Sequence, residues 1–219
     1  MPDKAYDLAV VDPPYGIGVG PLGYTQGAAR VGKAVAERRD YRVDKDWDIK
    51  PPKEYFDQLF RVSKKQVIWG GNYFADMLPP SKSFICWDKR VSDAMTNDFA
   101  DCEYAWMSEG MGVARVFRFC WNGMLQGNMS NKEQRFHPTQ KPVALYKWIF
   151  KNYAKPGYRI LDTHLGSGSS RIAAYDMGCY EFTGYEISKE YFDKQEERFE
   201  KHTQQTNLFL MEDFENERV

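Results

Sequence analysis

Short apolar runs and longer amphipathic stretches alternate along this chain of 219 residues. A short apolar run bounded by turn residues predicts a strand, and apolar residues spaced three or four apart predict a helix. Strand and helix alternate through the C-terminal half, so the pattern predicts an α/β protein with a parallel sheet and crossover helices. The predicted strands are residues 8–11, 66–69, 83–87, 103–107, 116–120, 159–161 and 182–185, and the predicted helices are residues 53–62, 142–153, 169–177 and 188–202.

Residues 17–48 interrupt this pattern. They contain six glycines or prolines and show no convincing apolar period, which predicts a long loop. Loops of this length in compact domains usually carry a function or are disordered. Since the chain shows no internal repeat and no linker, we expect a single domain over residues 1–219, without a separate target-recognition domain.

Composition limits the class of protein. Hydrophobic residues make up 42% of the chain, which is enough for a core. No apolar run approaches a membrane span and the N-terminus is polar, so we expect no membrane partner and a cytoplasmic location. The four cysteines, Cys86, Cys102, Cys120 and Cys179, form no C-x-x-C pair. We therefore expect reduced, mostly buried thiols and no metal site.

Charge is unevenly distributed along the chain. The net charge is −1, but residues 186–219 carry 10 acidic and 5 basic residues, which leaves +4 on residues 1–185. Residues 30–42 contain two acidic and five basic residues, the latter being Arg30, Lys33, Arg38, Arg39 and Arg42. Such a run is usually a solvated face. This run follows residues 10–16, which are described next, and its position there also fits contacts with nucleic-acid phosphates.

Residues 10–16, VVDPPYG, place a carboxylate, two prolines and an aromatic ring directly after an apolar run. Adjacent prolines cannot continue a sheet ladder, because each lacks an N–H and has a fixed φ. Asp12 to Tyr15 therefore form a stiff loop at the carboxyl end of a strand, where open α/β sheets bind ligands. The alternative is a strand ended by proline, with an incidental tyrosine.

Residues 160–170, ILDTHLGSGSS, read as a strand that ends at Asp162, a glycine turn and a helix start. Glycines allow a ligand close to the backbone, and free N–H groups at a helix start favour a polar group. Glu186 ends the next strand, 24 residues further on, where an acid can accept both ribose hydroxyls of a nucleoside. This order predicts an adenosine-bearing cofactor, although the dinucleotide fingerprint is absent. A third motif, HPTQKP at 137–142, suits a carboxylate but also fits an ordinary helix start.

Together these motifs resemble the DNA adenine-N6 methyltransferases in which the Asp-Pro-Pro-Tyr motif precedes the cofactor motif. The resemblance implies a Rossmann-like S-adenosylmethionine-dependent methyltransferase fold, with a mostly parallel sheet and helices on both faces. It implies S-adenosylmethionine as cofactor and double-stranded DNA, with the target adenine flipped out, as substrate. The matching segments are DPPYG at 12–16, IWGGNYF at 68–74, HPTQKPVALY at 137–146, LDTHLGSGSS at 161–170 and GYEIS at 184–188.

The resemblance also implies roles for individual residues. The Asp12 carboxylate and the Pro13 carbonyl would accept the two N–H bonds of the adenine amine, Pro14 would stiffen the loop, and Tyr15 would stack on the extruded base. Glu186 would bind the ribose of the cofactor, and Lys141 would pair with its methionine carboxylate. The remaining residues expected around the cofactor are His137, Thr139, Asp162, Gly166, Ser167 and Gly168.

The chain departs from the family pattern in three places. Thr163-His164 stands where the family usually has Pro-Phe, and we expect His164 to be a packed or hydrogen-bonded pocket residue. Family members commonly have a further strand and helix before the catalytic motif. We expect residues 207–211, NLFLM, to fill the sheet instead, and the alternative is a truncated N-terminus. The target sequence must then be read by residues 17–48, by residues 121–136, or by a partner.

Other functions remain open at this point. In cytosine-N4 methyltransferases the motif more often begins with serine, and in protein glutamine methyltransferases it begins with asparagine and the motif order is reversed. A catalytically silent DNA- or cofactor-binding subunit would have no chemical need for an intact DPPY segment. The sequence also leaves open a homodimer or a specificity partner. The protein can be bacterial, or phage-encoded and active in the host cytoplasm. Its biological role can be restriction protection in a restriction-modification system, phage evasion or regulation.

Overall fold

The computed structural model describes residues 1–17, 48–90, 100–122, 125–137, 139–178 and 180–216, with the backbone alone for residues 206–216. The chain divides into two compact units, Met1–Gln134 and Arg135–Val219. Across the described residues, no helix combines the length and apolar character that a membrane span requires.

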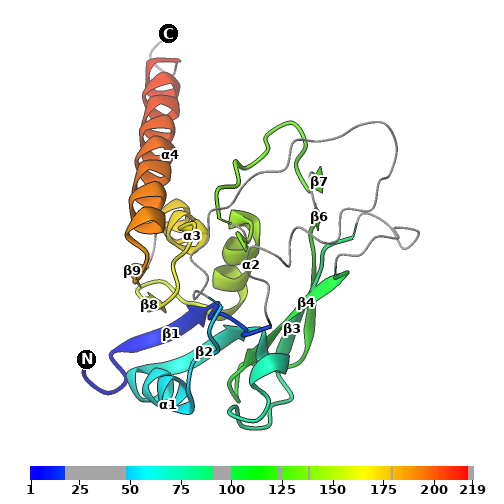
Figure 1. The fold of residues 1–219 in the computed structure, drawn as a ribbon. Helices are drawn as coiled ribbons and strands as arrows, with labels where there is room; N and C mark the ends of the chain where they lie inside the picture. Colours follow the sequence, from blue (N-terminus) through cyan, green and yellow to red (C-terminus); the bar gives the residue numbers. More distant parts are fainter. Residues whose placement is uncertain (18–47, 91–99, 123–124, 138, 179, 217–219) are drawn as a thin grey trace, which may run out of the picture. The chain divides into compact units, whose positions relative to one another are not determined.

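The first unit is built on five strands in the order β5-β3-β4-β2-β1 (Figure 1). Strands β1 and β2 are parallel, as are β3 and β5, whereas β4 runs antiparallel to both β2 and β3. Buried apolar side chains from the central strands form the core, with Trp69 and Trp87 among the largest. The elements of this unit are β1 (Tyr6–Val11), α1 (Lys53–Val62), β2 (Ser63–Trp69), η1 (Gly71–Phe74), β3 (Phe84–Asp88), β4 (Cys102–Met107), β5 (Arg115–Arg118), β6 (Trp121–Asn122) and β7 (Leu125–Gln126).

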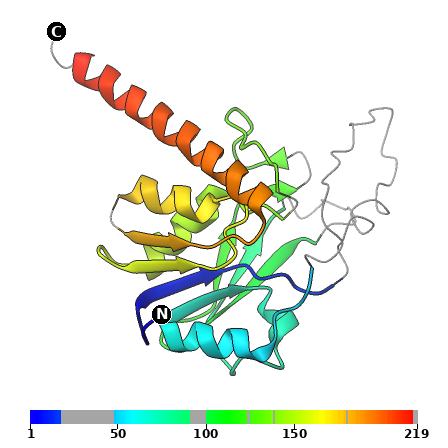
Figure 2. The same cartoon turned by 60° about the vertical axis from the view of Figure 1, so that its left-hand side comes forward.

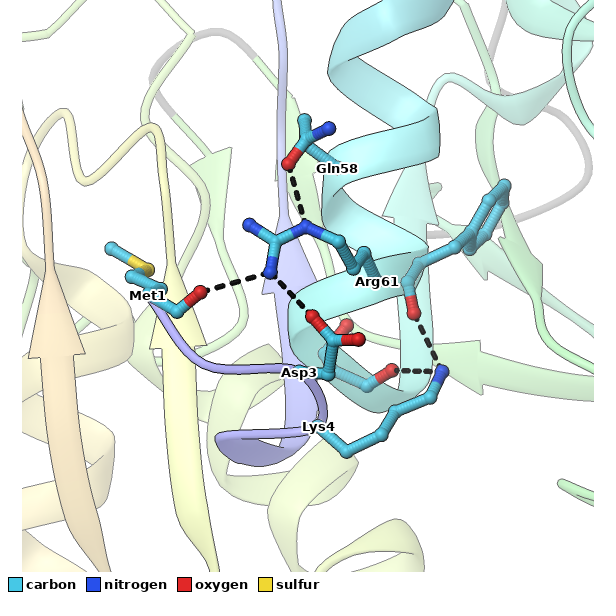
Figure 3. A network of polar contacts seen from close by, with 7 residues as sticks. Met1, Asp3, Lys4, Gln58 and Arg61 are labelled. Carbon is cyan, nitrogen blue, oxygen red and sulfur yellow. Dashed lines mark hydrogen bonds and ion pairs between the residues drawn. The ribbon is translucent and has the colours of Figure 1, made fainter.

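Helix α1 packs against β2 and buries Phe56 and Leu59, which lie three positions apart on one face. Its C-terminal end binds the chain segment that leads into β1 (Figure 3). The Lys4 ammonium donates to the Phe60 carbonyl at 2.6 Å, where a cation satisfies the free carbonyls at a helix end. The Arg61 guanidinium donates to the main chain and to a carboxylate of the same segment. These contacts fix the start of β1, the strand that leads into the DPPYG motif.

The second unit places a parallel strand pair beside three helices. Strands β8 and β9 are parallel, and α3 connects them as the crossover that the sequence predicts. Helix α3 packs on α2, β9 and α4. Helix α4, orange to red in Figure 2, continues well past the end of α3. The elements are α2 (Val143–Tyr153), β8 (Arg159–Asp162), α3 (Ser169–Met177), β9 (Glu181–Gly184) and α4 (Lys189–Asn216).

Two sequence expectations are wrong. Residues 207–211 belong to helix α4 and do not form a strand, because no glycine or proline interrupts the chain between Ser188 and Asn216. The cysteines are not mostly buried where the structure describes them, since Cys86 and Cys120 are half-buried and Cys102 is exposed. The seven predicted strands and four predicted helices are otherwise all present. Their ends agree within two residues, except that β2 begins at Ser63 and α4 continues to Asn216.

Candidate functional site

The DPPYG loop (residues 12–16) follows β1 directly, at its carboxyl end. The Tyr15 hydroxyl donates to Oδ1 of Asp12 at 2.7 Å, which folds the ring back toward the carboxylate. The Tyr15 ring also stacks on Tyr73, with centroids 4.9 Å apart and planes at 20°, and meets the edge of Phe74 at 6.1 Å. Pro13 is buried and Pro14 is half-buried. The loop therefore holds its acid and its aromatic ring in one fixed arrangement.

The two described ends of the segment 17–48 lie close together. The Gly16 amide donates to Oδ1 of Asp48 at 2.8 Å. Gly16 has φ +68°, and an added Cβ would lie 2.8 Å from Cβ of Lys50, so the chain needs glycine here. Residues 17–48 thus start and finish beside Tyr15. The predicted phosphate contacts, Arg30, Lys33, Arg38, Arg39 and Arg42, lie outside the described residues.

The IWGGNYF motif brings a second element to the DPPYG loop. The chain leaves β2 at Trp69, turns at Gly70 and enters the short helix η1, where the Tyr73 amide donates to the Gly70 carbonyl at 2.8 Å. The close turn presents Tyr73 and Phe74 to the Tyr15 ring. An added Cβ on Gly71 would lie 2.5 Å from Cβ of Trp106 in β4. Glycine at position 71 therefore allows η1 to approach the sheet.

In the second unit, Asp162 ends β8 and is 2% exposed. Its Oδ1 accepts from the His164 amide at 3.0 Å, and its Oδ2 accepts from the Ser170 hydroxyl at 2.6 Å. The carboxylate therefore ties both ends of the glycine turn (residues 163–168) to the strand. Gly166 and Gly168 have φ of +52° and +73°, a conformation that glycine adopts without strain.

Glu186 receives two main-chain donors. Its Oε2 accepts from the Gly166 amide and its Oε1 accepts from the Ser188 amide, both at 2.8 Å. An ionised carboxylate has about four lone-pair sites, so each oxygen keeps capacity for a further donor. The acid is thus fixed in position and still able to bind a pair of hydroxyls.

The HPTQKP motif lies against the glycine turn. The Nε2 atom of His137 is 3.5 Å from the position that a Cβ on Gly166 would take, and its ring meets Tyr191 at a centroid distance of 4.3 Å. The Thr139 amide donates to Nδ1 of His137 at 3.4 Å, so the neutral ring carries its hydrogen on Nε2. Burial lowers the pKa of His137 to about 4, and the positive charge of Lys141 adds to this effect.

Lys141 and His164 complete the polar groups of this unit. Lys141 is only 5% exposed, which is unusual for a lysine and typical of a functional or paired one. Burial also lowers the pKa of His164 to about 4, and its Nδ1 lies 3.0 Å from the Thr163 hydroxyl. His164 is therefore a neutral, hydrogen-bonded residue, as the sequence led us to expect.

Sequence reasoning missed the residues of α4 that support the glycine turn. The Arg198 guanidinium donates to the Ser167 carbonyl at 2.8 Å and to the Ser169 hydroxyl at 2.9 Å. Gln195 is 1% exposed, and its side chain lies against Gly168. The two residues are three positions apart and so share a face of α4. No motif marks them, and only this helical spacing could have drawn attention to them.

Residues 121–136, one of the segments suggested for sequence reading, contain a closed loop. The Gln126 side chain donates to the Glu133 carbonyl at 2.9 Å and accepts from the Glu133 amide at 2.8 Å. This pair of bonds closes the loop at its base. Residues 127–132, GNMSNK, are all exposed between them. The segment is thus a pre-formed, polar projection of the first unit.

The second unit fits an adenosine-bearing cofactor such as S-adenosylmethionine. Two glycines at positive φ let a ligand approach the main chain, and the fixed Glu186 carboxylate matches a ribose. The buried Lys141 offers the positive charge that a methionine carboxylate requires. In the part of the chain that the structure describes, no three His, Cys, Asp or Glu side chains group as metal ligands would.

Comparison with known proteins agrees with this fit. The family model for N6/N4 DNA methylases, described as DNA methylase, matches residues 88–197, which is half of the chain. The protein therefore belongs to this family of DNA methyltransferases, and its cofactor is S-adenosylmethionine.

Individual relatives support the same assignment. The chain is 20% identical to the type II methyltransferase M.HpaI of Haemophilus parainfluenzae over 224 residues, which cover 91% of this chain and 70% of the relative. Its fold is similar to that of the M1.HpyAVI–SAM complex (TM-score 0.50, 20% identity, 88% of each chain). It is also similar to PvuII DNA methyltransferase, described as cytosine-N4-specific (TM-score 0.53, 13% identity, 93% of this chain and 85% of that one). The Rossmann-like methyltransferase fold predicted from the sequence is thus confirmed.

Proposed function

We propose that the protein methylates the N6 amine of an adenine in double-stranded DNA. The observation that carries this proposal is the DPPYG loop, in which an aspartate ends β1 and receives a hydrogen bond from the tyrosine three residues later. An aspartate at this position favours adenine, because the corresponding motif of cytosine-N4 enzymes more often begins with serine. The family itself includes both specificities.

The chemistry at the amine requires two hydrogen-bond acceptors. The lone pair of the adenine amine is delocalised into the ring, which makes the nitrogen a poor nucleophile. Acceptance of its two N–H bonds by the Asp12 carboxylate and the Pro13 carbonyl draws the hydrogens out of the ring plane and localises the lone pair. Proximity and orientation of the amine and the methyl group then add to the rate enhancement. The amine becomes acidic only after methylation, so no strong base is needed before attack, and Asp12 then receives the proton.

Chemistry on a base inside a duplex requires that the base be turned out of the stack. Tyr15 offers an aromatic ring beside Asp12, and stacking on such a ring is worth about 1–3 kcal/mol per base. The flanking prolines restrict the backbone, so little conformational entropy is lost when the base arrives.

The cofactor carries an electrophilic methyl group on a sulfonium. The chain's own residues bind and orient the cofactor: Glu186 accepts the ribose hydroxyls, Lys141 pairs with the carboxylate of the methionine portion, and the glycine turn admits the ligand to the main chain. The neutral His137 keeps Nε2–H as a donor beside Gly166. Asp162, Ser167 and Thr139 act through the hydrogen bonds that hold these groups in place.

Two segments of the first unit are our candidates for contact with DNA. The five cations between residues 30 and 42 suit phosphates, and the chain on either side of their segment, at Gly16 and Asp48, lies beside Tyr15. The exposed residues 127–132 present amides, a hydroxyl and a lysine, which suit base edges and phosphates. A homodimer or a specificity partner could supply the rest of the recognition.

The test is transfer of a tritiated methyl group to unmethylated DNA, followed by separation of the deoxynucleosides. We expect the label in N6-methyldeoxyadenosine. Label in N4-methyldeoxycytidine would replace the proposal by the cytosine specificity. No transfer, with DNA and S-adenosylmethionine both bound, would identify a silent subunit.

A further inference from the structure

Gly70 lies against the ring of Tyr15. A Cβ added to Gly70 would be 2.2 Å from Cε1, 2.5 Å from Cδ1 and 2.7 Å from Cζ of that ring. These three distances are nearly equal, which places the added atom over the face of the ring. A point beyond the ring edge would be much farther from the two neighbouring carbons than from the nearest one. The backbone of the turn at Gly70 therefore contacts a face of the Tyr15 ring.

The contact joins two segments that lie far apart in the sequence. Gly70 ends the stretch from β2 and precedes η1, and its amide donates to the Tyr104 carbonyl of β4 at 2.9 Å. The turn is thus fixed to the sheet on one side and meets the Tyr15 ring on the other. The same turn supplies Tyr73, which stacks on Tyr15 and is 38% exposed. The ring of Tyr15 is held by its hydroxyl at Asp12, by the Gly70 backbone and by Tyr73.

We propose that Gly70 is a positioning residue for the transfer reaction: its lack of a side chain lets the Tyr15 ring lie against the turn while its hydroxyl stays on Asp12. The inference rests on the proposed function of Tyr15. A methyl group at position 70 would displace the ring and break the alignment of its hydroxyl with Asp12. Misplacement of a catalytic group by about 1 Å can cost about 100-fold in rate.

Backbone conformation alone offers a simpler reason for glycine at this position. Gly70 has φ +70°, which disfavours any other residue whatever the neighbours are. Gly110 separates the two explanations, because it belongs to the same unit and has φ +81°, but has no atom within 4 Å of an added Cβ. Alanine at either position carries the backbone strain, and only alanine at position 70 meets the Tyr15 ring.

The experiment compares Gly70→Ala with Gly110→Ala in the full chain. It measures the single-turnover rate of methyl transfer with DNA and S-adenosylmethionine saturating, the Kd for S-adenosylmethionine, and the melting temperature. We expect Gly70→Ala to lose about 100-fold in rate with the cofactor Kd within about twofold of wild type. Gly110→Ala should keep the rate within about threefold. Equal rates for the two variants would overturn the inference.

A double-mutant cycle with Tyr15→Ala gives a second readout. Once the ring is gone, Gly70→Ala should cause no further loss of rate, and its melting temperature should fall no more than that of Gly110→Ala. The comparison of Tyr15→Ala with the double variant can be made even if the single Gly70→Ala variant does not fold. An undiminished loss in the Tyr15→Ala background would contradict the positioning role. Wild-type turnover by Tyr15→Ala itself would instead contradict the proposed function of Tyr15.

Discussion

Glu186 beside the glycine turn and Asp12 in the DPPYG loop receive different kinds of donor. Both oxygens of Glu186 receive a main-chain amide. Asp12 has the hydroxyl of the Tyr15 side chain among its donors. Main-chain donors are fixed by the turns around them, whereas a tyrosine hydroxyl can rotate its hydrogen.

This difference matches the proposed tasks of the two regions. The ribose of the cofactor is unchanged by methyl transfer, so a carboxylate whose position does not change can bind it before and after the reaction. Asp12 must accept an amine hydrogen and then a proton. The Tyr15 hydroxyl suits this task, because it can turn its hydrogen away and free a lone pair of the Asp12 carboxylate. The comparison predicts separable effects, with catalysis lost through the DPPYG loop and cofactor affinity lost through the glycine turn.

The largest effect is expected from Asp12→Ala. Loss of one acceptor for the amine removes an interaction made in the transition state, which costs about 10²–10³ in rate for comparable hydrogen-bonding groups, and more where the group also takes the proton. We expect methyl transfer to become undetectable in single-turnover assays. Asp12→Asn is the control, because it keeps an oxygen acceptor but not the base, and it should retain a slow rate. Equal rates for Asp12→Ala and wild type would remove the DPPYG loop from the reaction.

Glu186→Ala should act on the cofactor alone. Loss of a charged acceptor for two hydroxyls weakens binding by about 1.5–3 kcal/mol. We expect the KM for S-adenosylmethionine to rise accordingly, while kcat at saturating cofactor changes much less. Glu190→Ala is a matched control, since Glu190 pairs with Lys194 on the exposed face of the same region. A KM within twofold of wild type would show that Glu186 is not the ribose ligand.

Acid should destabilise the protein through its two buried histidines. The pKa values of His137 and His164 are lowered from 6.5 to about 4 in the fold. Between these values the unfolded chain takes up protons that the folded chain does not. The free energy of unfolding is therefore unaffected above about pH 6.5 and falls toward pH 4, by at most about 1.4 kcal/mol per pH unit for each histidine.

Urea unfolding measured from pH 7 to pH 4.5 tests this dependence. The variant with both His137→Gln and His164→Gln should show a shallower fall over the same range. An identical slope in the variant and the wild type would mean that other groups cause the loss of stability.

The smallest effect is expected from Arg198→Ala. The residue holds the Ser167 carbonyl and the Ser169 hydroxyl, so its removal should loosen the glycine turn without touching the DPPYG loop. We expect cofactor affinity to fall by about 1 kcal/mol, the usual net worth of a hydrogen bond. Arg198→Lys should recover part of the loss, and Lys201→Ala, on the exposed side of α4, should cause none. Calorimetric titration with S-adenosylmethionine measures all three.

The elements that the sequence predicts well are those with a strong period and clear ends. The limits of α1 and α3 agree with their apolar spacing, and Gly178 ends α3 in a left-handed conformation. Strands β6 and β7 are two residues long and leave no period to detect. The prediction of a strand at residues 207–211 is wrong because four consecutive apolar residues suit a strand as well as a helix, and only the uninterrupted helix before them decides.

The candidate site likewise contains residues that the sequence predicts and residues that it does not. The acids and glycines stand in contiguous motifs, so their chemistry can be read from the sequence. The groups that hold them come from elsewhere: Gly70 and Tyr73 reach Tyr15, and Arg198 reaches the glycine turn, across 31 positions in the case of Ser167. Such contacts depend on tertiary packing, which no local pattern encodes.

In the proposed function, the DPPYG loop performs catalysis and the second unit holds the cofactor. Calorimetric titration of S-adenosylmethionine into Asp12→Ala tests it most directly, because this variant is expected to be inactive. The account predicts a Kd within about threefold of the wild-type value, less than the roughly 1 kcal/mol worth of a single hydrogen bond. A cofactor affinity lost in parallel with turnover would contradict the division of labour between the two regions.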